Sequence, residues 1–128
     1  MVLKKTTSLC RAMAVSAVLL SGFISSQAFA HAHLKTQTPA ADTVLAASPT
    51  ELSLGFSEGI EPNFSKITLT GADKKAVKTG ALTLAANDNT QTVVTLPDAL
   101  SPGKYWVTWS VVSVDGHKTN GQYSFTVK

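Results

Sequence analysis

The sequence predicts an all-β fold for residues 31–128, in which two antiparallel sheets pack face to face. Apolar side chains recur at every second position in several short runs, which is the spacing of strands with one buried face. Clusters of Pro, Gly, Asn and Asp separate these runs and indicate tight turns. A parallel α/β fold would need helical crossovers, and the one helical candidate, Thr79–Ala86, contains Thr and Gly, which disfavour a helix.

Each predicted strand carries its apolar residues on one face. In chain order these faces are Leu52, Leu54 and Phe56; Ile67 and Leu69; Val94 and Leu96; Tyr105, Val107, Trp109 and Val111; and Tyr123, Phe125 and Val127. The turn signals that separate these runs are Ser48-Pro49, Glu61-Pro62-Asn63, Gly71-Ala72-Asp73, Asn87-Asp88-Asn89, Ser101-Pro102-Gly103 and Asn120-Gly121. The longest predicted strand is Lys104–Val114, whose other face places Trp106 at the surface or rim. Six or seven short strands in one small domain are therefore expected.

The charge of the chain is divided unevenly. The 128 residues include 11 Lys and Arg against 8 Asp and Glu, but Lys4, Lys5 and Arg11 account for the whole excess, and residues 31–128 are neutral overall. A nucleic-acid partner would require a basic surface that neutralises phosphates, so none is expected. The length allows one domain and excludes a large multidomain enzyme.

Residues 1–30 have the organisation of a cleavable secretory signal peptide. The pair Lys4-Lys5 precedes an apolar run, Ala12–Ile24, and Ala28-Phe29-Ala30 places small residues at the two positions that a signal peptidase reads. An uncleaved membrane anchor is the alternative, but the run is short for the roughly 30 Å of hydrocarbon in a bilayer. We therefore expect cleavage after Ala30 and an exported domain that begins at His31.

Cleavage would leave a domain without sulfur, because Met1, Cys10 and Met13 all lie in the first thirty residues. Without cysteine, residues 31–128 form no disulfide, thiolate nucleophile, iron–sulfur cluster or thiolate zinc site. Cu(I) prefers thiolate or thioether ligands, so a Cu(I) site is not expected either. Any metal site in this domain must use nitrogen and oxygen ligands.

Three histidines are the candidate ligands, and they fall at two places in the chain. After cleavage His31 would carry both a free α-amine and an imidazole, which together can chelate one metal ion. Asp115 and His117 are two residues apart, so in extended backbone their side chains point the same way. Among the available divalent ions, Cu(II) binds such a set most strongly. We therefore predict a Cu(II) site formed by His31, Asp115 and His117.

Other interpretations of these residues remain open. Asp115-Gly116-His117 could be an ordinary solvated turn between strands. His31-Ala32-His33 could bind Cu(II) without any fold, through the amine, two backbone amides and the His33 imidazole. In a folded site, His33 is instead a spare or outer ligand. Glu58, in Phe56-Ser57-Glu58, is most simply a charge at the end of a strand.

Residues 31–128 resemble the periplasmic copper-binding proteins of the CopC type, and in particular the members that begin with HAHL. The stretches that carry the resemblance are His31-Ala32-His33-Leu34, Pro39-Ala40, Phe56-Ser57-Glu58, and Trp109 to His117 followed by Gly121. The resemblance implies an immunoglobulin-like Greek-key β-sandwich or barrel of about seven strands.

The resemblance also implies how copper is bound. It suggests that the amine and imidazole of His31 bind Cu(II) together with Asp115 and His117, similar to a histidine brace, with Glu58 near the site as an outer group. Some members hold Cu(I) in a Met-rich loop, but this chain has no methionine after residue 30, so that second site is not expected. Members serve copper resistance or uptake, often beside an inner-membrane partner of the CopD type.

The sequence therefore favours a monomeric periplasmic protein that binds Cu(II), sequesters or transfers it, and is not an enzyme. One alternative is a copper-dependent oxidative enzyme with a histidine brace, against which stand the small size and the lack of an evident substrate-binding face. The other alternative is an immunoglobulin-like interaction module without a metal.

Overall fold

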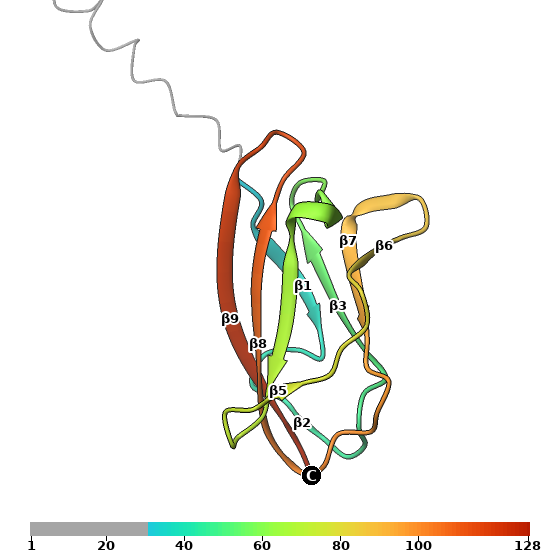
Figure 1. Cartoon of the computed structure of the whole chain (residues 1–128), viewed down its shortest axis with the longest axis vertical. Helices are drawn as coiled ribbons and strands as arrows, with labels where there is room; N and C mark the ends of the chain where they lie inside the picture. The colour runs from blue at the N-terminus through green and yellow to red at the C-terminus, as the bar shows by residue number, and fades with distance from the viewer. Residues whose placement is uncertain (1–30) are drawn as a thin grey trace, which may run out of the picture.

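The computed structural model describes residues 31–128, and the predicted signal peptide, residues 1–30, lies outside the described residues. Nine strands and one short 3-10 turn make up the described part, drawn as a two-layered sandwich in Figure 1. The elements are β1 (Leu34–Thr38), β2 (Val44–Leu45), β3 (Glu51–Phe56), η2 (Pro62–Phe64), β4 (Lys66–Thr70), β5 (Ala76–Val77), β6 (Thr83–Ala85), β7 (Asp88–Thr95), β8 (Gly103–Val112) and β9 (Lys118–Val127). No helix in this range is long and apolar enough to cross a membrane.

The strands form one sheet of four and one sheet of five. Their orders are β1-β3-β7-β6 and β2-β9-β8-β4-β5, and every pair is antiparallel except β2, which runs parallel to β9. Many neighbours in a sheet are not consecutive in the chain, so the chain passes between the sheets as it does in Greek-key sandwiches. The all-β sandwich predicted from the sequence is confirmed.

The strand boundaries differ from the sequence prediction at several places. There are nine strands rather than about seven, because β2 and β5 have two residues each and are too short to show an alternating pattern. The helical candidate Thr79–Ala86 contains β6 instead of a helix. Asn120-Gly121 was predicted as a turn, and this is wrong, because both residues lie inside β9, where Gly121 pairs with Trp109. The longest strand ends at Val112, because the chain turns back from Ser113.

The core lies between the two sheets and is built from the alternating residues. Every residue on the predicted apolar faces is buried except Tyr123, which is half-buried. Phe56 packs edge-on against Trp109 at 5.2 Å between ring centroids, and this contact joins the two sheets. Trp106 lies on the opposite face of β8, with Lys104 Nζ 5.2 Å from its ring centroid, as the alternation predicted. The paired strands β8 and β9 extend from the Gly103–Val127 pair to the Val112–Lys118 pair, and the Ser113–His117 loop joins them at that second end.

Tyr123 is the residue whose polar group this core leaves unpaired. Its hydroxyl oxygen is buried and has no hydrogen-bond partner among residues 31–128. We expect Tyr123→Phe to raise the free energy of unfolding at pH 7 by about 1 kcal/mol, since it removes a buried hydroxyl that has lost its water. Urea unfolding of the two proteins measures the difference, and a clear loss of stability in the variant would contradict the unpaired hydroxyl.

Burial raises the pKa of Tyr123 above its ordinary value of 10.0, so the fold favours the protonated form. Below pH 10 Tyr123 is protonated in both states and its ionisation does not reduce the stability of the fold. Above pH 10 the unfolded chain ionises more readily than the folded chain, so the free energy of unfolding declines as the pH rises. The same unfolding experiment above pH 10 should show this decline in the native protein, and Tyr123→Phe should lack that component.

Candidate metal centre

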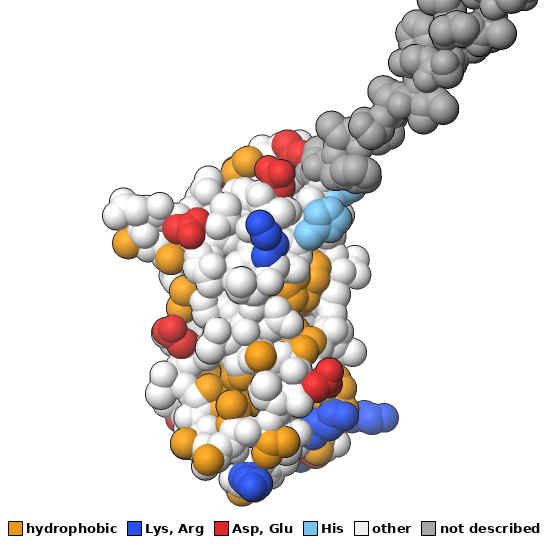
Figure 2. Space-filling model, turned by 180° about the vertical axis from the view of Figure 1, so that it is seen from behind, with side chains coloured by type: hydrophobic (Ala, Val, Ile, Leu, Met, Phe, Trp, Pro, Cys, Tyr) orange, Lys and Arg blue, Asp and Glu red, His pale blue; other side chains and the backbone are white. Residues whose placement is uncertain are grey.

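Two of the predicted ligands come together at one end of the sandwich. The rings of His31 and His117 lie 4.8 Å apart between centroids and meet edge to face at 78°. His31 begins the described chain, whereas His117 ends the loop between β8 and β9, so only the folded chain brings them together. Both side chains are exposed, and Figure 2 shows a histidine at the upper end of the molecule.

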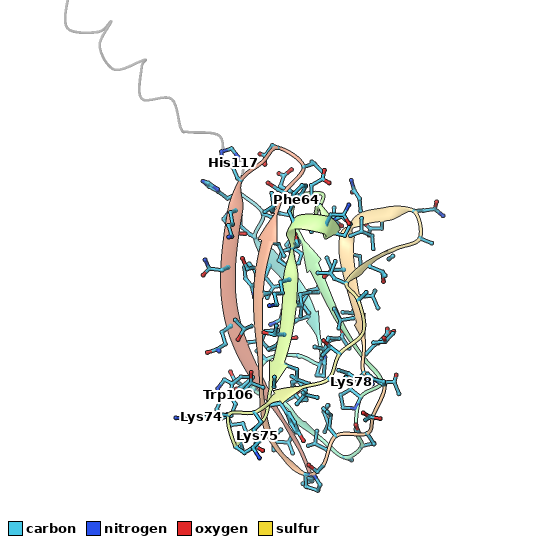
Figure 3. The ribbon with its side chains drawn as sticks, in the orientation of Figure 1. Phe64, Lys74, Lys75, Lys78, Trp106 and His117 are labelled. Atoms are coloured by element: carbon cyan, nitrogen blue, oxygen red, sulfur yellow. The ribbon has the colours of Figure 1, made fainter. Side chains whose placement is uncertain are left out.

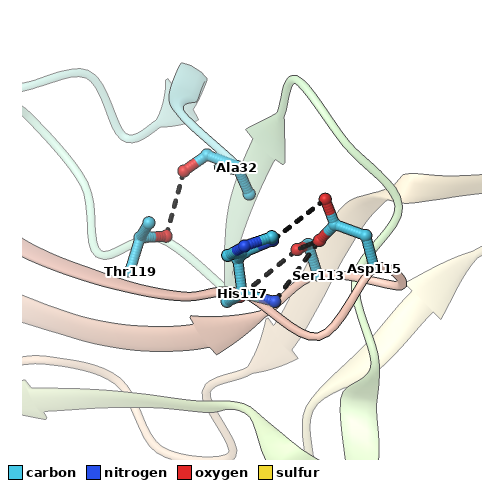
Figure 4. Close-up of polar contacts among 5 residues, drawn as sticks. All are labelled: Ala32, Ser113, Asp115, His117 and Thr119. Carbon is cyan, nitrogen blue, oxygen red and sulfur yellow. Dashed lines mark hydrogen bonds and ion pairs between the residues drawn. The ribbon is translucent and has the colours of Figure 1, made fainter. Parts of the chain in front are cut away.

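The segment that carries His31 is fastened to both sheets. Ala32 is 1% exposed and belongs to the core, and its carbonyl oxygen accepts a hydrogen bond from Thr119 Oγ1 of β9 at 2.9 Å (Figure 4). On the other side, the His33 amide donates to Ser57 Oγ at 2.8 Å and the Ser57 amide donates to the His33 carbonyl at 2.9 Å. Successive side chains of extended backbone alternate, so burial of Ala32 turns its two histidine neighbours outward.

The loop that carries His117 is closed by its own backbone. The Ser113 amide donates to the His117 carbonyl at 2.9 Å, and the Gly116 amide donates to the Ser113 carbonyl at 2.8 Å. Gly116 has a φ of +89°, which glycine adopts without strain, and nothing lies within 4 Å of where its Cβ would be. The glycine is therefore needed for the backbone angle of the turn rather than for space between Asp115 and His117.

The side chains of Asp115 and His117 contact each other inside this loop. Asp115 Oδ2 lies 3.2 Å from His117 Nδ1, and its Oδ1 accepts hydrogen bonds from the Ser113 hydroxyl and, at 3.3 Å, from the His117 amide (Figure 4). The Ser113 hydroxyl is the main cause that lowers the pKa of Asp115 below its ordinary value. Desolvation opposes this effect, and the contacts with His117 lower the pKa further. Asp115 is thus a carboxylate at neutral pH that engages Nδ1 of His117 and leaves Nε2 as the free ring nitrogen.

The other two predicted residues lie at the same end but outside this arrangement. His33 is exposed and lies beside Ser57. Glu58, which follows Ser57 in the chain, is half-buried. Within residues 31–128, neither side chain forms a hydrogen bond or ion pair with His31, Asp115 or His117, and no three His, Asp or Glu side chains gather closely enough to enclose a metal ion. The structure therefore gathers the candidate ligands as two adjoining pairs, His31 with His117 and Asp115 with His117.

Three supporting residues were not predicted from the sequence. Ser57 and Thr119 hold the segment of His31 through contacts that join distant parts of the chain, which no local pattern indicates. Ser113 is different, because its spacing of two from Asp115 and four from His117 was visible as Ser-x-Asp-x-His. It is 0% exposed, and its hydroxyl bonds both Asp115 and, at 3.2 Å, the His117 carbonyl.

We expect Ser113→Ala to raise the pKa of Asp115 toward its ordinary value of 3.8, because the variant lacks the hydroxyl that is the main cause of the lowered pKa. Since the folded-state pKa is lowered, this carboxylate favours the fold above the ordinary pKa, and the effect is lost as the pH falls through the lowered value. An NMR titration of the carboxyl carbon checks the shift. An unchanged Asp115 titration would contradict the assigned role of Ser113. Ser110→Ala, on β8, is the control.

The fold and this end of the molecule define the chain as a small β-sandwich domain with a candidate metal site of nitrogen and oxygen donors. The model of the protein family described as the CopC domain matches residues 34–128 of this chain. The chain belongs to this family, and the resemblance inferred from the sequence is confirmed.

Relatives with names and known structures agree with this assignment. Protein YobA of Escherichia coli strain K12 is 45% identical over 112 residues, which cover 88% of this chain and 90% of that protein. The crystal structure of CopC from Methylosinus trichosporium OB3b is similar with a TM-score of 0.72 and 34% identity, over 77% of this chain and 94% of that chain. The structure of PcoC, described as a methionine-rich copper resistance protein from Escherichia coli, has a TM-score of 0.68 and 36% identity, over 77% of this chain and all of that one.

Proposed function

We propose that this protein binds Cu(II) at the end of the sandwich that carries His31 and His117, and sequesters or hands on the ion without turnover. The observation that carries the proposal is the 4.8 Å separation of the two imidazole rings. A metal–nitrogen bond is about 2 Å long, so one ion between the rings can contact a nitrogen of each. Copper is here the cargo of the protein.

The donors at this end suit Cu(II). His117 offers Nε2, because its Nδ1 is engaged by Asp115, and the lowered pKa of Asp115 keeps a negative charge beside the ion. His31 adds an imidazole, and the backbone nitrogen of His31 becomes an amine ligand once the preceding residues are removed. Nitrogen and oxygen donors without sulfur favour Cu(II) over Cu(I). The relative PcoC is described as methionine-rich, whereas this chain has two methionines, both before residue 31.

The same proposal includes a compartment and a partner. We infer that residues 1–30 direct export and are cleaved after Ala30, so that the domain of residues 31–128 acts in the periplasm as a monomer. The histidine end then exchanges copper with a membrane protein, for which an inner-membrane partner of the CopD type is the candidate. Cleavage is part of the function in this proposal, because the peptide bond before His31 otherwise makes its nitrogen a poor ligand.

A Cu(II) titration followed by electron paramagnetic resonance tests the proposal on two proteins. One begins at His31, and the other carries Ala30 as a single additional residue before it. We expect one equivalent of Cu(II) to bind tightly to the first protein and much more weakly to the second. We also expect bound Cu(II) to raise the melting temperature of the first, because a ligand that binds only the folded state stabilises it.

Three outcomes would count against the proposal. Equal binding of Cu(II) by both proteins would show that the terminal amine is not a copper ligand. Binding that depends on His33 but not on His117 would indicate the local chelate of residues 31–33. No tight binding by either protein would leave an interaction module without a metal.

A further inference from the structure

The end of the sandwich that carries His117 also exposes apolar side chains. Within residues 31–128 the exposed large apolar residues are Phe64, Val114 and Val44, with 72%, 54% and 59% of their surfaces exposed. Phe64 lies in η2 and Val114 precedes Asp115, and Figure 3 shows Phe64 at the same end as His117. Val44 lies in β2, which pairs with the last residues of β9 at the opposite end. A partner that buries an exposed aromatic side chain gains binding energy from that contact.

Hydrogen bonds fix the backbone segments that carry these two side chains. The Phe64 amide donates to the Glu61 carbonyl at 3.2 Å. Ser65 then fixes the turn, because its hydroxyl donates to the Glu61 carbonyl at 2.7 Å and accepts from the Val112 amide at 2.9 Å. The Val114 amide donates to the Gly59 carbonyl at 2.9 Å. Because the backbone of the turn is already fixed, a partner that covers Phe64 does not have to order this segment.

Acidic residues outnumber basic ones in and next to the loops that carry this apolar pair. The loops 57–65, 86–89 and 113–117 carry Glu58, Glu61, Asp88 and Asp115, whereas Lys66 and Lys118 directly follow the first and the last of these loops. The three loops lie at one end, since Ile60 donates to the Asn89 carbonyl and forms a bridge with Ser113. The side-chain and backbone hydrogen bonds from Thr90 lower the pKa of Asp88 below its ordinary value. Figure 2 shows acidic side chains close to the histidine.

We propose that Phe64 and Val114, bordered by Glu58 and Glu61, form the docking surface for the protein that exchanges copper with this chain. The inference rests on the proposed function. The partner presents an apolar pocket for Phe64 with Lys or Arg at its rim, because charge complementarity selects a basic surface against this acidic border. A second copy of this chain would place like charges opposite each other, and an anionic lipid surface would repel the same acids.

Docking at this surface would bring a partner's ligands next to His31 and His117. Val114 is separated from His117 by two residues in one closed turn. A partner that covers Val114 therefore reaches the end of the molecule where the two rings meet. In this extension of the proposed function, the partner binds through residues that are not copper ligands but lie at the same end of the molecule.

The test compares Phe64→Ser with Val44→Ser, which makes a similar apolar-to-polar change on an exposed residue at the other end. Cells that lack the native gene are complemented with the full chain or a variant, and the Cu(II) concentration that halves the growth rate is measured. The purified proteins, beginning at His31, are compared for Cu(II) affinity and melting temperature. We expect Phe64→Ser to keep both properties but to lose the copper phenotype, as His117→Ala does, whereas Val44→Ser behaves like the native protein. Loss of a central aromatic anchor commonly weakens a contact by about 30-fold or more.

A charge variant provides a second, independent measurement. Glu61→Lys should likewise weaken the copper phenotype and leave Cu(II) affinity unchanged, because it reverses one charge of the acidic border. A native phenotype in both Phe64→Ser and Glu61→Lys, with the phenotype lost in His117→Ala, would overturn the docking surface and leave the proposed function standing. A native phenotype in His117→Ala as well would overturn the proposed function itself. Sedimentation of the copper-loaded protein as a dimer that Phe64→Ser dissociates would assign the surface to a second copy and overturn the inferred partner.

Discussion

His117→Ala is expected to weaken Cu(II) binding by about 100-fold or more in the protein that begins at His31. The variant removes the imidazole that lies 4.8 Å from the His31 ring and whose Nδ1 is engaged by Asp115. Loss of an outer partner alone commonly weakens metal binding by about 10- to 100-fold, so loss of a ligand should exceed that range. Competition with a chelator of known Cu(II) affinity measures the change.

His33→Ala is the matched control, because it removes another exposed imidazole at the same end, one that has no contact with Asp115 or His117 among residues 31–128. It should keep nearly native affinity. Asp115→Asn should lie between the two variants, since the amide can still hydrogen-bond the His117 ring but lacks the negative charge. If His117→Ala kept its affinity and His33→Ala lost it, the site would be the local chelate at the start of the chain.

Gly121→Val is expected to have the largest effect on stability, with a loss of about 2–3 kcal/mol in the free energy of unfolding. A Cβ at residue 121 would lie 2.5 Å from Trp109 Cζ2 and 2.7 Å from Cε2. The indole of Trp109 cannot move aside easily, because it is 7% exposed and packs against Phe56 of the other sheet. The added side chain must therefore push apart the pairing of β8 and β9 or the contact between the sheets.

Urea unfolding measures this loss, with Asn120→Ala as the control. Asn120 precedes Gly121 in β9 and its exposed side chain points to the opposite face, so its removal should change stability by no more than about 0.5 kcal/mol. A Gly121→Val protein of native stability would show that the indole has room to shift. Because β8 and β9 carry the Ser113–His117 loop, partial separation of these strands should also weaken Cu(II) binding.

The strands and their buried faces were predictable because period-2 alternation is a local property of the sequence. The apolar residues of β3, β4, β7, β8 and the end of β9 were identified, and all but Tyr123 are buried. No alternating face was identified for β1, β2, β5 or β6, and of these β2 and β5 have two residues each, which carry no pattern. The error at Asn120-Gly121 has a specific cause. Such a pair often marks a hairpin turn, but here the glycine makes room for Trp109 on the neighbouring strand.

The sequence by itself determined the all-β class, the absence of sulfur ligands after residue 30, and the closeness of Asp115 to His117, although a closed turn and not the expected extended backbone brings these two side chains together. Each of these depends on residue types or on spacings of a few residues. Only the tertiary structure decided that His31 meets His117, because that contact requires Ala32 in the core and the bond from Thr119 to its carbonyl. The exposed position of Phe64 also depends on the fold. A single apolar residue between turn signals has no periodicity, so its burial is set by contacts with distant parts of the chain.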